Sequence, residues 1–411
     1  MINLYYDNLN LGNGRTGDSV PVRYDITINK HLDWINLNYQ LKLIKDFTES
    51  TDLNLYVIEL FYVQRVGEIF ENIPIETLNL LRNNKLTLLM YFPTEGFKLD
   101  LYDNWFLKMH EKLVEFGLAN TNKYFIYNNL TIESQYQKMV ESNEFPCTFN
   151  KVFFLPFFQL EYLNRLGQST QKITEVSIAK RSKNFCCLNA KMRAHRLLLV
   201  SELSRRNLLE NSYTSLLGDN PNFKFSENTI EHATNVLVDL FKKTTDIPKE
   251  SQEYLLKFAK EWQPMYLDDT TGIDLEAEVI TDFFDNSFFS LVSETGMDHY
   301  LRISEKTFKP IANLHPFIVI GCHGTLDYLR SLGYQTFPEL FDESYDEETN
   351  IPKRLLMVAD QVEKFCKLLP DEKERRFRLV TEKLKHNYNL FFDVLPEKNK
   401  EKFRQIFISM R

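Results

Sequence analysis

The chain has 411 residues, more than one hydrophobic core usually holds, so two or three domains are expected. Hydrophobic residues make up 43% of it and charged residues 26%, which is typical of a globular protein and excludes a disordered chain. The net charge of −8 argues against a basic nucleic-acid coat protein, although a local basic groove is compatible with it.

The cysteines and the apolar runs favour a cytoplasmic protein. The five cysteines have no regular spacing, which indicates reduced thiols and neither a disulfide framework nor a zinc site. No apolar run approaches the roughly 18 residues of a membrane span, so we expect no membrane insertion. The first residues also lack the basic start and apolar stretch of a signal peptide. Frequent Asn, Lys, Ile, Phe and Tyr suit an AT-rich genome such as that of a virus, and the compartment would then be the host cytoplasm.

Short apolar runs alternate with helical patterns in the first 150 residues. Strands are predicted over 53–60, 85–92 and 123–127, and helices over 75–81 and 104–116. Strands that alternate with helices are typical of βαβ units in a parallel sheet.

A second α/β block begins near residue 151. Its predicted strands are 152–158, 184–188, 288–292, 316–320 and 334–337. Its predicted helices are 193–209, 226–262 with Ser226 as the N-cap, one that opens at Ser304, and 325–332, which Gly333 closes. Residues 352–411 are predicted to be helical throughout, because their apolar positions recur at three- and four-residue spacing.

The fold class that follows is α/β, with two Rossmann-like domains and a helical C-terminal segment. The expected bounds are 1–150, 151–350 and 351–411.

The segment that starts at Ser304 carries the clearest functional signal. It reads Ser-Glu-Lys-Thr-Phe-Lys-Pro-Ile, and an apolar strand led by Pro316 follows. Ser304 is expected to cap a helix whose free N–H groups and positive dipole end attract anions. Glu305 would accept hydrogen bonds from sugar hydroxyls, while Lys306 and Lys309 would face a phosphate. The alternative is an ordinary cap with an acidic first turn.

This segment resembles the donor site of GT-B glycosyltransferases, and is most similar to their fucosyltransferase-like and exostosin-like branches. The resemblance covers 288–337, about an eighth of the chain. It implies that Glu305 binds the ribose of a nucleotide sugar. It also implies an N-terminal acceptor domain, a C-terminal donor domain and C-terminal helices that pack across both. The chain departs from the pattern at His315, where small residues are common, and in the Cys322-His323 loop.

A basic segment forms the second signal. Residues 180–206 hold eight Lys or Arg residues against one acid, Glu202. Lys191, Arg193 and Arg196, at the start of a predicted helix, would clamp a pyrophosphate. The matching strand–turn–helix of GT-B enzymes supplies a basic residue to the diphosphate. A solvated basic face, or one paired with the acidic run 339–348, is the alternative.

The segment Gly12–Gly17 matches G-x-G-x-x-G, but no helix start follows it, so a dinucleotide fingerprint is not expected. In a GT-B enzyme such a loop can line the cleft, where Gly14 and Arg15 would contact donor or acceptor. An ordinary surface loop is the alternative.

An inverting transferase needs a base that takes the proton of the acceptor hydroxyl. Glu95 follows a predicted strand and is one candidate. Asp18 is the second, with Asp25 as a rival. The favoured alternative for each is a structural or solvated acid, and a retaining enzyme could work without such a base.

Several motifs are missing from the sequence, among them HxH, HExxH, D-x-D, Walker A and G-x-S-x-G, so a metal site, an NTPase or an α/β hydrolase is not expected. The expected function is metal-independent transfer of a sugar from a nucleotide-diphosphate donor to a hydroxyl of a glycan, a protein or a modified DNA base, with no further cofactor. One alternative is a non-catalytic α/β protein that binds a nucleotide or an acidic partner. Another is a nucleotide-dependent enzyme of different chemistry on two Rossmann-like domains.

Overall fold

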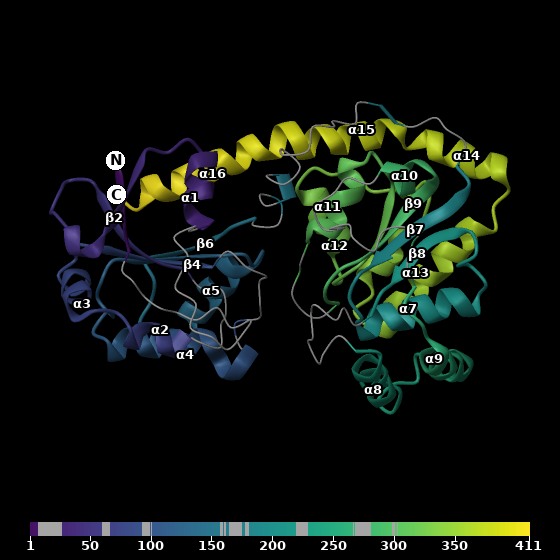
Figure 1. Cartoon of the computed structure of the whole chain (residues 1–411), viewed down its shortest axis with the longest axis horizontal. Coiled ribbons are helices and arrows are strands. Elements are labelled where there is room, and N and C mark those ends of the chain that lie inside the picture. Colours follow the sequence, from purple (N-terminus) through teal and green to yellow (C-terminus); the bar gives the residue numbers. More distant parts are fainter. Residues whose placement is uncertain are drawn as a thin grey trace. The chain divides into compact units, whose positions relative to one another are not determined.

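The computed structural model describes most of the chain in two compact units. The first unit is Met1–Phe157 together with Pro396–Arg411, and the second is Phe158–Leu395 (Figure 1). The predicted boundary at residue 150 lies close to this division, and the predicted segment 351–411 is shared between the units. The described residues are 1–6, 27–59, 66–92, 99, 101–156, 159, 162–163, 175–176, 181–218, 229–265, 267, 281–297, 301 and 303–411.

The described strands of the first unit form one parallel sheet in the order β2-β1-β3-β4-β5-β6. Its central strands are buried on both faces, which explains why they read as continuous apolar runs. The bounds are β1 Ile2–Tyr6, β2 Tyr39–Leu43, β3 Leu53–Glu59, β4 Thr87–Phe92, β5 Lys123–Tyr127 and β6 Lys151–Phe154.

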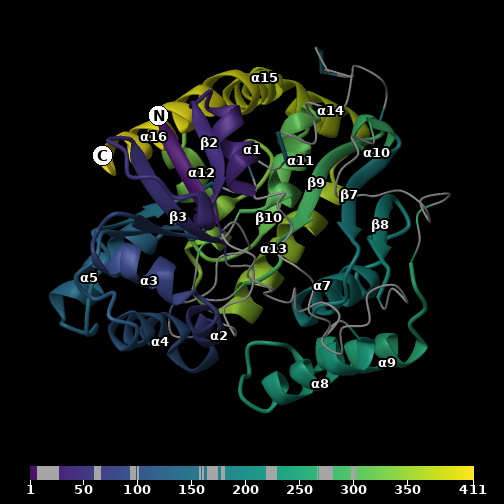
Figure 2. The ribbon, with the colours of Figure 1, turned by 60° about the vertical axis from the view of Figure 1, so that its left-hand side comes forward.

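Helices cover both faces of this sheet. Figures 1 and 2 show α2 to α5 on one face and α1 with α16 on the other. Aromatic side chains fill the core between strands and helices, as in the stack of Phe92 on Trp105 at 5.5 Å between ring centroids. The bounds are α1 Thr27–Trp34, α2 Val66–Glu71, α3 Ile75–Arg82, α4 Leu101–Glu115, α5 Ile132–Glu141 and α16 Leu395–Ser409, with a 3-10 turn at Ile44–Asp46.

The described strands of the second unit form a smaller parallel sheet in the order β8-β7-β9-β10. The chain leaves β7 toward β8 and later returns to the other side of β7 for β9 and β10. Right-handed crossovers therefore place α7 and α11 on opposite faces of the sheet. The bounds are β7 Lys183–Asn189, β8 Ser212–Leu216, β9 Ser287–Ser293 and β10 Phe317–Ile320.

The helices of the second unit build one core around this sheet. α7 packs against α8, α9 and α13, while α11 packs against α15. The bounds are α7 Ala194–Arg205, α8 Ile230–Phe241, α9 Lys249–Glu261, α10 Thr281–Asp285, α11 Glu305–Ala312, α12 Thr325–Ser331, α13 Ile351–Cys366, α14 Pro370–Leu379 and α15 Thr381–Asn389. A 3-10 helix spans Glu343–Glu347, and a π-helical segment, Leu390–Val394, joins α15 to α16.

Three predicted elements of the second block are wrong. The strand predicted over 152–158 is β6, which pairs with β5 in the sheet of the first unit. Residues 334–337 do not form a strand, because Gln335 N and Phe337 N donate to the side chains of Asn387 and Glu343. The predicted helix 226–262 is two helices, since α8 ends at Phe241 and Pro248, which cannot continue a helix, is the N-cap of α9. Ser226 lies outside the described residues, and the side chain of Thr229 caps α8.

Candidate functional site

The strand order of the second unit creates a topological switch point between β7 and β9. In open parallel sheets, ligands collect outside the carboxyl ends of the strands at such a point. Here β7 ends at Asn189 and β9 at Ser293, and α7 and α11 begin a short distance further along the chain. This edge is therefore the candidate site.

Glu294 directly follows β9 and is completely buried. Its carboxylate accepts hydrogen bonds from Ser304 N at 3.1 Å, Ser304 Oγ at 2.5 Å and Thr307 Oγ1 at 2.6 Å. A carboxylate offers only acceptors, so three converging donors suit it. Glu294 thereby holds the start of α11 against the end of β9.

The main-chain oxygen of Glu294 binds the start of α7. It lies 3.0 Å from His195 Nε2 and accepts from Arg196 Nη2 at 3.4 Å. One buried residue therefore joins the two segments that the sequence singled out separately, the one around Arg193 and the one that opens at Ser304. Sequence reasoning missed Glu294, although an acid two residues beyond the predicted strand 288–292 was a usable signal.

Arg196 turns inward and does not present its guanidinium to a ligand. Only 3% of the residue is exposed, and it also donates to Ser293 O at 3.1 Å and Lys191 O at 3.0 Å. Burial, with the nearby charge of Arg193, lowers the pKa of Arg196 to about 10. We therefore assign Arg196 a positioning role in place of the predicted phosphate contact.

Several polar atoms at this edge are buried without a hydrogen-bond partner in the described part of the unit. A buried polar group left unpaired costs about 1–3 kcal/mol, so a cluster of them is uncommon. They come from the ends of β7 and β9 and the start of α7. A polar ligand could complete the hydrogen bonds of those that do not belong to the inward-facing Arg196. These atoms are Asn189 Oδ1, Ser293 Oγ, Arg193 Nε and Arg196 Nε.

The start of α11 agrees with the sequence prediction. Ser304 is the N-cap, and its Oγ accepts from Lys306 N at 3.3 Å. Glu305 pairs with the ammonium of Lys306. Burial alone would raise the pKa of Glu305, but the positive charges of Lys306 and Lys309 outweigh it and hold the pKa below its usual value. Glu305 is therefore an ionised hydrogen-bond acceptor.

The loop after β10 closes around Glu294. A Cβ on Gly321 would lie 3.0 Å from Thr325 Oγ1 and 3.6 Å from Glu294 Cγ, so a glycine allows this close approach. Gly324, with φ of 77°, caps the start of α12. The predicted helix 325–332 and its closure by Gly333 are confirmed.

The remaining predicted site residues divide into two groups. Lys191 follows β7 at the same edge as Arg193, and Lys309 lies in α11; both are partly buried. Four predicted site residues lie outside the described residues, namely Gly14, Arg15, Asp18 and Glu95. The rival base Asp25 lies outside them as well.

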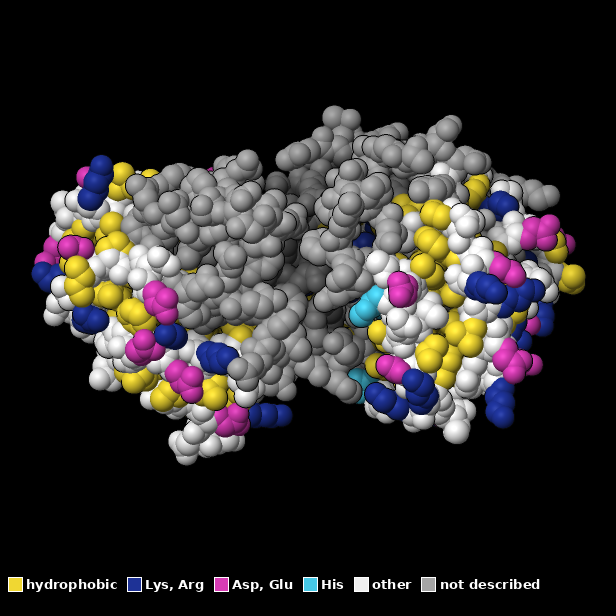
Figure 3. Space-filling view, turned by 60° about the horizontal axis from the view of Figure 1, so that its bottom comes forward, with side chains coloured by type: hydrophobic (Ala, Val, Ile, Leu, Met, Phe, Trp, Pro, Cys, Tyr) yellow, Lys and Arg dark blue, Asp and Glu magenta, His cyan; other side chains and the backbone are white. Residues whose placement is uncertain are grey.

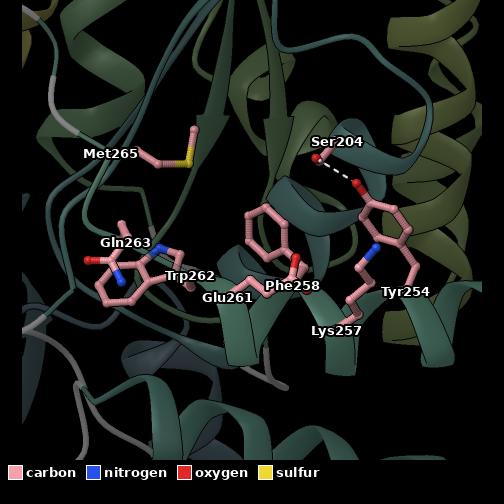
Figure 4. Close-up of a pocket in the computed structure, with 8 residues that line it drawn as sticks. All are labelled: Ser204, Tyr254, Lys257, Phe258, Glu261, Trp262, Gln263 and Met265. Atoms are coloured by element: carbon pink, nitrogen blue, oxygen red, sulfur yellow. Dashed lines mark hydrogen bonds between the residues drawn. The ribbon is translucent and has the colours of Figure 1, made fainter.

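A pocket of about 340 Å³ runs along α9 in the same unit (Figure 4). At one end, the hydroxyls of Ser204 and Tyr254 share a hydrogen bond of 3.0 Å. At the other end, the main chain of Met265 pairs with Leu216, the register neighbour of Asn189. This end therefore lies one strand away from the switch point. The lining residues are Ser204, Tyr254, Lys257, Phe258, Glu261, Trp262, Gln263 and Met265.

Charges of both signs are interspersed on the described face in Figure 3, and no field of a single sign dominates it. Within the described ranges, no three or more His, Cys, Asp and Glu side chains gather as a metal site would require. Nor do those ranges contain a helix with the length and apolar character needed to cross a membrane.

No protein-family model matches the chain, and no curated protein sequence is similar to it.

Proposed function

We propose that the protein is a nucleotide-sugar-dependent glycosyltransferase whose donor binds at the carboxyl edge of the second sheet. The observation that carries this proposal is the junction at Glu294. Through this residue the start of α7, with its basic side chains, and the start of α11, with its ionised acid, converge on the switch point.

The two helix starts would divide the donor between them. Arg193 stands at the N-cap of α7, and its buried Nε has no hydrogen-bond partner among the described residues. Guanidinium groups bind phosphate oxygens through charge-assisted hydrogen bonds. Glu305 on α11 is an ionised acceptor, which suits the two hydroxyls of a ribose. A diphosphate at the switch point would therefore have its nucleoside on the α11 side.

Such a site stabilises the transition state of sugar transfer. As the bond between the sugar and the diphosphate breaks, negative charge accumulates on the departing nucleoside diphosphate. Cations and helix N-termini that are already in place stabilise this charge more than they stabilise the bound donor. The acceptor would supply a hydroxyl of a glycan, a protein or a modified DNA base.

The first experiment is a thermal-shift screen of the full chain against UDP, GDP, CDP and ADP. A nucleotide that binds only the folded state raises the melting temperature. We expect one diphosphate to do so, and we expect Arg193→Ala and Glu305→Ala to abolish the shift. The same nucleotide linked to a sugar should then be hydrolysed slowly or transferred to an added acceptor.

Each negative outcome has a definite meaning. No shift with any of the four nucleotides would contradict the donor site. A shift without any turnover of the matching nucleotide sugars would favour a non-catalytic nucleotide-binding protein.

A further inference from the structure

His195 is the second residue of α7, and the function proposed above gives it no task. Its Nε2 lies 3.0 Å from the main-chain oxygen of Glu294. A carbonyl oxygen can only accept a hydrogen bond, so the proton of the imidazole stands on Nε2. Glu294 therefore sets the tautomer of this ring.

The ring is also held neutral. Burial lowers the pKa of His195 to about 3, and the positive charges of Arg196 and Arg193 act in the same direction. A neutral ring with its proton on Nε2 carries a lone pair on Nδ1. The second nitrogen can therefore accept a hydrogen bond and cannot donate one.

Nδ1 is left for a ligand. It takes no hydrogen bond from the described residues, and His195 as a whole residue is not fully buried. Its neighbours on α7 differ from it in kind, because Arg193 and Arg196 offer only donors. His195 thus places one acceptor among donors at the switch point.

The chemistry of this acceptor selects its partner. At neutral pH the phosphates of a nucleotide diphosphate carry no proton to donate, so the lone pair on Nδ1 gains nothing from them. The nucleoside is assigned to Glu305, which starts the helix on the opposite face of the sheet. On the α7 side, the remaining group of the nucleotide sugar that can donate a hydrogen bond to Nδ1 is a hydroxyl of the sugar.

We propose that Nδ1 of His195 accepts a hydrogen bond from a hydroxyl of the sugar to be transferred, and that His195 is thereby a specificity-determining residue. This inference rests on the proposed donor site. It predicts that the residue acts on the sugar part of the donor and leaves the affinity for the diphosphate alone unchanged.

The test compares two ligands on two proteins. Calorimetry would give the dissociation constants of UDP and UDP-glucose, and of GDP and GDP-mannose, for the wild type and for His195→Phe. Phenylalanine keeps the ring volume and removes both nitrogens, while Arg196 still pairs with Glu294 O. We expect the sugar conjugate to bind about tenfold more weakly, as the loss of one hydrogen bond implies, and the diphosphate to change less than twofold.

The outcomes separate this inference from the proposed function. If the wild type binds neither these four ligands nor CDP or ADP, the donor site itself is wrong. If the wild type binds a sugar conjugate and His195→Phe binds it equally well, or loses conjugate and diphosphate alike, the assignment of His195 is overturned. Should His195→Phe melt far below the wild type, His195→Gln would take its place in the same comparison, because its amide can donate to Glu294 O as Nε2 does.

Discussion

The hydroxyl of Ser304 donates a hydrogen bond of 2.5 Å to the carboxylate of Glu294, ten residues earlier in the chain. This contact fixes the first turn of α11 to the end of β9. It also leaves the side chain of Glu305, the next residue, at the edge of the sheet where the site lies.

Removal of the Glu294 carboxylate should destabilise the second unit. Glu294→Ala leaves Ser304 N, Ser304 Oγ and Thr307 Oγ1 buried without an acceptor, and we expect a loss of about 3 kcal/mol in the free energy of unfolding. Glu294→Gln keeps one oxygen in place and should lose about 1 kcal/mol. Urea unfolding, followed by hydrogen exchange in the β9 and α11 peptides, would measure both. Equal stability of the two variants would contradict the role given to the carboxylate.

Substitution of Arg193 should lower nucleotide affinity, whereas substitution of Arg196 should lower stability. Arg193→Ala breaks no hydrogen bond among the described residues, so we expect stability within about 0.5 kcal/mol of the wild type and nucleotide affinity at least tenfold lower. Arg196→Ala leaves Lys191 O and Ser293 O without their donor and should cost about 2 kcal/mol of stability. Melting curves with and without the nucleotide would distinguish the two variants. A loss of stability in Arg193→Ala with a loss of nucleotide binding alone in Arg196→Ala would contradict the roles assigned to the two residues.

His110 should contribute to acid unfolding of the first unit. Burial lowers its pKa to about 3, below the ordinary value of about 6.5. The unfolded chain therefore takes up the proton first, and stability that is complete above pH 6.5 is lost as the pH falls toward 3, by about 1.4 kcal/mol per pH unit.

His110→Phe should remove this part of the pH dependence. The ring stacks on Phe145 at 4.1 Å and its Nε2 is buried and unpartnered within the described residues, so phenylalanine should fold with equal or higher stability at pH 7. Urea midpoints between pH 7 and 5 would show the shallower slope. His232→Gln, on the exposed surface of α8, is the matched control and should leave the slope unchanged.

Neighbouring residues of α16 should differ sharply in their effect on the first unit. Phe407 is 1% exposed and Ile408 is 48% exposed. Phe407→Ala should therefore cost about 3 kcal/mol of stability, and Ile408→Ala less than about 1 kcal/mol. Hydrogen exchange in the β4 and β5 peptides would report it, and equal protection in the two variants would mean that α16 does not support this sheet.

The elements that could be predicted from the sequence are those with a strong local pattern. The prediction of a strand over 123–127 has the observed bounds, because its apolar run of four residues, 124–127, lies between polar residues. β8 was missed, since Ser-Tyr-Thr-Ser-Leu at the sheet edge has no apolar run. Residues 334–337 were mistaken for a strand because their aromatic side chains are buried, although their N–H groups bond to side chains.

The candidate site could be predicted only where its residues are close in sequence. The cap by Ser304 and the acid beside it are local features, and both are present. Glu294 escaped because its partners lie outside its own segment: Ser304 is 10 residues away and His195 is 99. The inward turn of Arg196 is likewise decided by carbonyl groups of β9, which no spacing in its own segment reveals.

The membership of α16 in the first unit has a consequence for biosynthesis. The ribosome makes the first 157 residues early, yet the helix that completes their core, through Phe403, Ile406 and Phe407, emerges only after the whole second unit. Domains usually fold in the order of their synthesis. Here the first unit cannot complete its core until α16 has been synthesised, and part of its apolar surface stays uncovered until then. The second unit can therefore fold first. Chains whose synthesis stops within α16 would therefore leave the apolar surface of the first unit open to aggregation and the unit open to proteolysis.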